Sequence, residues 1–230
     1  MPKVYYKNIL EIACFSVEAC LEAEKAGADR IEFCAEYGIG GITPKHEDVL
    51  RVKKLISIPV HVIIRPRGGN FLYSSEEIEI MKNDILFCKS IGINGVVFGV
   101  LNAFNKIDLE INKELIEFAK PMSTTFHRAI DECENLEEAI SDVIKLGFDR
   151  VLTSGGKKNA LDGVEELRTL NRKFGTTIIV IAGGGIRSSN FKSMINETQC
   201  KEYHSAAITN NTDLIDANEV TLLKEIINQI

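Results

Sequence analysis

The sequence has no apolar run near the roughly 20 residues that a membrane-spanning helix needs, and it has no CxxC pair. Its N-terminus, MPKVYYKNILEIAC, lacks the apolar region and the small-residue cleavage site of a signal peptide. The six cysteines are spread along the chain and do not form a disulfide framework. These absences predict a cytoplasmic protein with no membrane partner.

The chain also lacks an excess of positive charge, because its net charge is −6. A nucleic-acid backbone requires a basic surface, so we do not expect a nucleic-acid partner. A small anion requires only a local positive site and stays possible. The 230 residues, 45% of them hydrophobic, are enough for one large core.

Strand and helix signals alternate from end to end and repeat at a usual length for one strand–helix unit. Eight such units predict a single (β/α)8 TIM barrel that spans residues 1–230 as one domain, with a doubly wound open sheet as the alternative. The expected strands are Ile9–Ala13, Arg30–Phe33, Val60–Ile64, Gly95–Phe98, Thr124–Phe126, Arg150–Leu152, Ile178–Ile181 and Glu202–His204.

Local signals mark where helices begin. Ser16 is placed to cap the first helix, and Thr43-Pro44 has the pattern of an N-cap followed by a first-turn proline. Ser74 and Glu77 have the spacing of a capping box.

Several expected strands carry charged residues where a barrel interior is normally apolar. On the second strand, alternation places Arg30, Glu32 and Cys34 opposite the apolar residues, and therefore inward. A buried charge must pair or bind a ligand. At strand starts we expect an internal ion-pair network of Glu11 and Glu32 with Arg30 and Arg150, and at strand ends we expect a site. The other residues expected to face inward are Glu11, His61, Arg65, Arg150, Glu202 and His204.

The most informative segment is IPVHVIIRPRGGNF, residues 58–71, in which a strand delivers Arg65 and Arg67 beside two glycines. Ligands of parallel α/β proteins bind at the carboxyl ends of strands. Two guanidinium groups there predict a clamp for a carboxylate or phosphate. A salt-bridged loop is the structural alternative.

Other strand ends supply hydroxyls, amides and acid–base groups. Glu32, His127 and His204 are the candidate catalytic residues, because carboxyl and imidazole groups transfer protons near neutral pH. A lone histidine such as His127 also has a structural explanation. The candidate anion-binding residues beside the arginines are Ser154, Gly183, Gly184, Gly185 and Ser205, since loops after the seventh and eighth barrel strands often bind phosphate.

Cys14 and Cys34 end the first two strands, and neighbouring strands lie about 4.8 Å apart. Two thiolates at that spacing favour a soft ion such as Cu(I). Alternation places Cys34 inward but Cys14 with Leu10 and Ile12 on the opposite face. A shared metal site therefore requires a twist or bulge where the first strand ends.

Taken together, these motifs resemble the CutC family of copper homeostasis proteins over nearly the whole chain. The matching segments are LEIACFSVEA, AGADRIEFCA, GGITP, IPVHVIIRPRGGNFLYS, TTFHRAID, RVLTSG, AGGGI and EYHSAA. The resemblance implies a TIM barrel, a cytosolic location, assembly into a homo-oligomer and a Cu(I) site at Cys14 and Cys34. The family often has a long polar segment before its last helix, whereas only Ala207 to Ala217 stand there in this chain.

Three functions follow. The leading hypothesis is cytosolic copper homeostasis through Cu(I) binding or trafficking. The rival is a barrel enzyme that acts on a small anionic substrate, and it accounts for the RPRGG, TFHR and GGG motifs that copper binding leaves unexplained. The third is a carrier or regulatory module that binds an anion without reacting.

Overall fold

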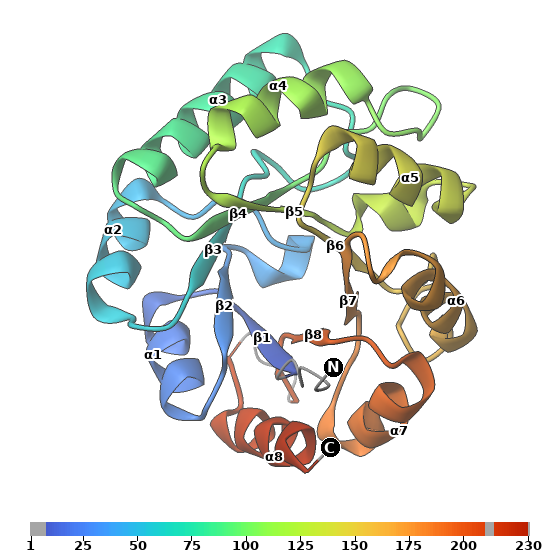
Figure 1. Cartoon of the computed structure of the whole chain (residues 1–230). Coiled ribbons are helices and arrows are strands. Elements are labelled where there is room, and N and C mark those ends of the chain that lie inside the picture. The colour runs from blue at the N-terminus through green and yellow to red at the C-terminus, as the bar shows by residue number, and fades with distance from the viewer. Residues whose placement is uncertain (1–7, 210–213, 230) are drawn as a thin grey trace, which may run out of the picture.

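The computed structural model describes residues 8–209 and 214–229, and residues 1–7, 210–213 and 230 lie outside the described part. Within it, parallel strands pair in sequence order and close into a barrel, with the helices as an outer ring (Figure 1). The strands are β1 (Ile9–Cys14), β2 (Arg30–Phe33), β3 (Val60–Ile63), β4 (Gly95–Phe98), β5 (Ser123–Phe126), β6 (Arg150–Thr153), β7 (Ile179–Gly183) and β8 (Glu202–Ser205).

Each strand is followed by a helix. The helices are α1 (Val17–Lys25), α2 (His46–Leu55), α3 (Ser75–Ser90), α4 (Leu109–Ala119), α5 (Leu136–Leu146), α6 (Val164–Phe174), α7 (Ser188–Thr198) and α8 (Ala217–Asn228), with short 3-10 turns η1 (Tyr37–Ile39) and η2 (Arg128–Glu132). The TIM barrel predicted from the alternation is confirmed, and the open sheet is wrong, because β1 pairs with β8. Positions 210–213 of the short segment before α8 lie outside the described residues.

Two of the three predicted helix starts are confirmed. Ser16 caps α1, and Ser74 and Glu77 form a reciprocal capping box at α3. The prediction at Thr43 is wrong, because α2 begins at His46. The Thr43 hydroxyl instead accepts a hydrogen bond from the Arg65 backbone N–H at 2.8 Å, which ties the loop before α2 to the end of β3.

The apolar faces of the strands meet the helices. Leu10 and Ile12 of β1 and Ile31 and Phe33 of β2 are fully buried in that layer. The residues between them face the barrel interior, which is therefore unusually polar. No helix within residues 8–209 and 214–229 has the length and apolar content that would let it cross a bilayer.

Candidate functional site

Near the amino ends of the strands, the barrel interior holds a closed ion-pair network, here called the amino-end network. Arg30 Nε lies 2.5 Å from Glu11 Oε2, and the same guanidinium also pairs with Glu202. Arg150 Nε lies 3.1 Å from Glu202 Oε2, and its Nη1 donates to the Ser123 hydroxyl at 2.6 Å. The network expected at Arg30 and Arg150 is present, with Glu202 as its second carboxylate.

Glu32, expected in that network, instead lies beside His204, which connects the network to the opening above it. His204 Nδ1 lies 2.8 Å from Glu11 Oε1, and its Nε2 lies 3.6 Å from Glu32 Oε2. Burial acts to raise the pKa of Glu11, but the Arg30 charge and the His204 hydrogen bond outweigh it and lower that pKa. Glu11 is therefore ionised and accepts a hydrogen bond from the Nδ1–H group of His204. The Nε2 atom of His204 consequently faces Glu32.

Glu32 and His204 form a coupled acid–base pair. Burial raises the pKa of the Glu32 carboxyl, although the charge of His204 opposes this. Burial acts to lower the pKa of His204, but the two carboxylates, Glu32 first, raise it overall. A carboxyl whose pKa is raised above its usual value is suited to accept and return a proton.

Above this pair, at the carboxyl ends of the strands, lies a cavity of about 310 Å³, here called the mouth pocket. This is at the small end of the range for ligand sites. The structure brings most of the predicted site residues to it. They are Glu32, Cys34, Arg65, His127, Gly184, Gly185, His204 and Ser205.

Arg65 is buried in the pocket wall and is held by the backbone. Its Nη1 donates to the carbonyl oxygens of residues 39–41 at 2.9–3.2 Å, and its Nη2 donates to Gly69 O at 2.8 Å. Its guanidinium carbon lies 4.9 Å from the centre of the Phe71 ring. The buried Nε has no hydrogen-bond partner in the described part of the chain. Four carbonyls therefore fix this side chain, and its Nε–H is left without an acceptor there.

His127 is the second fixed donor. Its Nδ1 accepts the Ala129 N–H at 3.3 Å, so the proton of the neutral ring is on Nε2. Burial, together with the Arg65 charge, lowers the pKa of His127 to about 3, and the ring is neutral at physiological pH. Nε2 is buried and has no partner among the residues that the structure describes. The ring packs 4.8 Å from Phe71, the aromatic side chain that also contacts Arg65.

Two further arginines line the mouth pocket and were not among the predicted site residues. Arg128 follows His127 directly, and its Nε lies 2.9 Å from Asp131. Arg187 is the N-cap residue of α7, and its Nη2 donates to Ile208 O at 2.8 Å. Only one residue separates Arg187 from the three glycines in the sequence. That closeness was the signal by which Arg187 could have been predicted as a site residue. With Arg65, these side chains give the pocket a positive wall.

The glycine loop after β7 divides into two roles. Gly184 and Gly185 have positive φ angles of 103° and 76° and line the pocket. Gly183 lies within β7 and does not line it. A Cβ atom on Gly183 would lie 2.5 Å from Leu152, so this glycine allows close packing between strands.

Besides Gly183, three of the predicted residues do not reach the pocket. Arg67 turns outward, where its Nε pairs with Glu77 at 2.6 Å, so Arg65 and Arg67 do not form the clamp expected from the sequence. Ser154 is buried behind the pocket, where its hydroxyl accepts from Arg128 at 2.9 Å. Cys14, the third, is described next.

The two cysteines lie on opposite faces of the barrel wall. Cys14 belongs to the core under the helices, where its thiol interacts with Cys20, whereas Cys34 lines the mouth pocket. Cys34 Sγ lies 3.6 Å from Glu32 Oε2, and burial together with that carboxyl raises the thiol pKa. Among the described residues, no group of three or more His, Cys, Asp or Glu side chains is arranged to hold a metal. The Cu(I) site remains a prediction.

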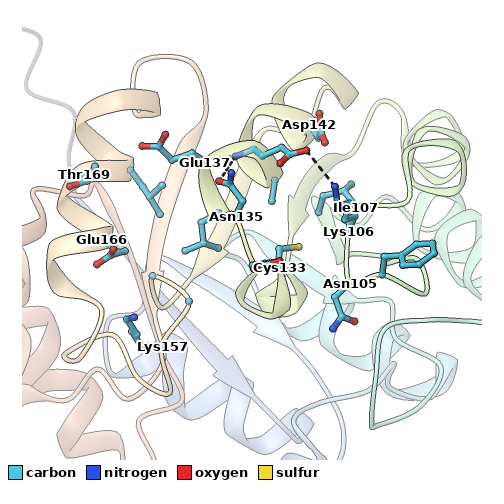
Figure 2. Close-up of a pocket in the computed structure, with 18 residues that line it drawn as sticks. Asn105, Lys106, Ile107, Cys133, Asn135, Glu137, Asp142, Lys157, Glu166 and Thr169 are labelled. Carbon is cyan, nitrogen blue, oxygen red and sulfur yellow. Dashed lines mark hydrogen bonds and ion pairs between the residues drawn. The ribbon is translucent and has the colours of Figure 1, made fainter.

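A larger cavity of about 750 Å³ lies outside the barrel, between the segments that follow β4 and β6 and helix α5 (Figure 2). None of the predicted site residues line it. Two ion pairs lie along it, with Lys106 at 3.8 Å from Glu138 and Glu137 at 2.6 Å from Lys173. The fixed donors and the acid–base pair thus converge only at the mouth pocket within the described residues.

Known proteins of similar structure include many barrels. Phosphoribosylanthranilate isomerase from Thermotoga maritima matches with a TM-score of 0.65 at 12% identity, covering 97% of this chain and 100% of that one. This similarity shows the fold alone. A CutC protein from Streptococcus agalactiae matches with a TM-score of 0.83 at 28% identity, covering 86% of this chain and 98% of that chain.

Sequence comparison is more specific. A CutC family protein from Parabacteroides distasonis is 43% identical over 202 residues, which are 87% of this chain and 83% of the relative. One from Proteus mirabilis is 46% identical over 198 residues, which are 86% of this chain and 78% of the relative. The CutC family model matches residues 8–209, and the chain therefore belongs to the CutC family.

Proposed function

We propose that this protein has a cytosolic role in copper homeostasis and that its own chemistry is acid–base catalysis on a small anionic molecule in the mouth pocket. Support for the cellular role is membership of the CutC family, together with the name of the Streptococcus agalactiae relative as a copper homeostasis protein. Support for the chemistry is the geometry of the pocket.

One observation carries the proposed chemistry. Arg65 and His127, which line the pocket, each carry a buried N–H group without an acceptor among the residues that the structure describes, and Glu32 lines the pocket too. Leaving a buried donor unpaired costs about 1–3 kcal/mol, so a ligand that accepts both hydrogen bonds recovers that cost. Positive charge around a small cavity selects an anion, and the carboxyl beside His204 supplies a proton acceptor.

The test is a binding screen by isothermal titration calorimetry with small phosphates and carboxylates. We expect binding that His127→Leu weakens at least tenfold, because the substitution removes one of the unpaired donors. Arg67→Met is the matched control, since Arg67 is an arginine of the same loop that does not line the pocket. Equal binding by wild type and His127→Leu, or an equal loss in Arg67→Met, would contradict the proposal.

A second candidate function is Cu(I) binding at this same end of the barrel. The observation that favours it is the Cys34 thiol in the pocket, 3.6 Å from the Glu32 carboxyl that His204 also faces. A thiolate is the soft ligand that Cu(I) prefers. Because the pKa of Cys34 is raised, metal binding must release a proton.

A Cu(I) competition titration under strict reduction tests this candidate on wild type, Cys14→Ala, Cys34→Ala and the double variant. Loss in Cys34→Ala alone identifies a pocket site, and loss in both single variants identifies the shared site that the resemblance implies. Binding that survives in the double variant rules out both. The homo-oligomer also remains a prediction, which light scattering on the same samples measures.

A further inference from the structure

We infer that the ligand is a small α-hydroxycarbonyl compound with an anionic end, and that the mouth pocket enolises it. This inference rests on the proposed function and specifies its substrate class and reaction. It follows from three features of the pocket, which are a pair of fixed N–H donors, a carboxyl base beside a histidine, and a separate positive wall.

The fixed donors suit a carbonyl oxygen. In Arg65, Nη1 and Nη2 donate to backbone carbonyls, and the buried Nε–H has no acceptor in the described part of the chain. His127 offers one N–H from a neutral ring. Arg65 and His127 both contact the Phe71 ring, so the two side chains are neighbours in the pocket wall. Two single N–H groups match one oxygen on which negative charge develops during a reaction.

The base is the carboxyl of Glu32. It lines the same pocket, and His204 lies 3.6 Å from it, fixed in turn by Glu11 at 2.8 Å. The Nε2–H of the charged His204 ring faces Glu32, and the ionised Glu11 stabilises that charge. The arrangement gives a buried carboxyl that can both take up and return a proton.

The step balances without a redox partner. A Glu32 oxygen takes the proton from the carbon next to the carbonyl, and the electron pair of the broken C–H bond forms a C=C bond. The carbonyl π pair moves to oxygen, and the resulting enolate oxygen accepts the N–H groups of Arg65 and His127. Return of the proton from Glu32 to carbon restores a carbonyl compound, with solvent hydrogen incorporated when the proton has exchanged.

The positive wall accounts for the anionic end. Arg128 and Arg187 line the pocket from η2 and from the N-cap of α7, next to Gly184 and Gly185. A phosphate or a carboxylate fits this chemistry equally well. The cavity of about 310 Å³ suits a small compound.

Hydrogen–deuterium exchange tests the inference. Three probes share one HOCH₂–C(=O)– group, and they are dihydroxyacetone phosphate, hydroxypyruvate and neutral dihydroxyacetone. In D₂O, we expect the wild type to accelerate loss of the CH₂ proton signal of at least one anionic probe over the protein-free rate. The neutral probe should exchange at least tenfold more slowly, and the faster anionic probe identifies phosphate or carboxylate as the preferred end.

Variants separate the parts of the site. Glu32→Gln should slow exchange about 10²–10⁴-fold, as loss of a general base does, while probe binding by calorimetry persists. His127→Leu should slow it about 10²-fold, and Arg187→Met should reduce the preference for the anionic probes. Arg67→Met should exchange at the wild-type rate. Circular dichroism checks that each variant is folded, and if Glu32→Gln is not, His127→Leu alone decides.

Each outcome has one meaning. Accelerated exchange that depends on Glu32 and His127 supports the inference. Binding of an anionic probe without exchange, or exchange that survives both substitutions, overturns enolisation and leaves the proposed anion site in place. If neither anionic probe nor any anion of the calorimetric screen binds, the proposed function fails and this inference fails with it.

Discussion

The amino-end network and the mouth pocket are two polar regions of one barrel interior, and they differ in whether their groups are satisfied. In the network, Arg30 and Arg150 each pair with a carboxylate. In the pocket, Arg65 Nε and His127 Nε2 are buried without an acceptor in the described part of the chain. Satisfied buried groups hold a structure together, whereas an unpaired buried group requires an explanation, and beside a cavity a ligand that accepts the hydrogen bond is one.

His204 lies at the boundary between the two regions. Its Nδ1 belongs to the network through Glu11, and its Nε2 faces Glu32 in the pocket. The network therefore does more than stabilise the barrel, because it fixes the orientation of a pocket residue. Substitutions in the network should cost stability first, and substitutions in the pocket should cost binding first.

The largest effect is expected for Arg30→Met. This change leaves Glu11 without its main counter-charge, and removing one partner of a buried ion pair typically costs about 3–5 kcal/mol. Urea unfolding measures the loss. Arg150→Met is the control within the network, and its loss should be smaller because its side chain is 18% exposed and Glu202 keeps Arg30. Equal losses would show that burial does not determine how much each arginine contributes to stability.

A matched pair of glycines tests the two regions with the same added atom. A Cβ on Gly95 would lie 2.6 Å from the His61 ring, and one on Gly99 would lie 2.9 Å from His127 Nδ1. Each alanine variant should therefore lose about 1–3 kcal/mol in urea unfolding. Calorimetry should show that only Gly99→Ala also loses anion binding. Loss of binding in both variants would indicate that disturbance of the barrel, and not of the pocket, removes it.

Much of the fold was readable because strand patterns are local. The observed strands β2 and β4 have the predicted bounds, and the ends of the other strands differ by two residues at most. The helix start predicted at Thr43 was wrong because the Thr43 hydroxyl is bonded to the backbone of Arg65, which is 22 residues away in sequence. Alternation alone placed Cys14 correctly on the helix-facing side.

The site was readable as a set of strand ends but not in its details. Arg65 and Arg67 would share a face if the strand continued, but β3 ends at Ile63, and the loop turns Arg67 toward Glu77. The unpaired nitrogens of Arg65 and His127 depend on which carbonyls and amides the fold brings near them. Such information is absent from residue types and spacing.

The two buried neutral histidines, His61 in the barrel interior and His127 in the mouth pocket, give a pH test. Burial lowers the pKa of each from 6.5 to about 3, so the unfolded chain binds protons that the folded chain does not. Their contribution to stability is complete above pH 6.5 and falls as the pH falls toward 3. Each histidine should lower the free energy of unfolding by up to about 1.4 kcal/mol per pH unit as the pH falls through this window.

Urea unfolding between pH 6.5 and 5.5 measures that slope, above the range in which most carboxylates titrate. His61→Asn and His127→Asn should each flatten it by a similar amount, and His127→Asn alone should also weaken anion binding. An unchanged slope in His127→Asn would show that this histidine is charged in the folded protein, and would remove the neutral donor from the pocket.

The smallest effect is expected for Arg67→Met, and it separates the clamp expected from the sequence from the observed pocket. Arg67 is 39% exposed and pairs with Glu77, which is 24% exposed, so the pair should contribute at most about 1 kcal/mol. Its guanidinium does not line the pocket, so anion affinity measured by calorimetry should stay at the wild-type value. In Arg65→Met, by contrast, one pocket N–H is lost and four loop carbonyls lose their donor. Reduced anion affinity in Arg67→Met without lost stability would bring this arginine back to the ligand and reverse the assignment of the two side chains.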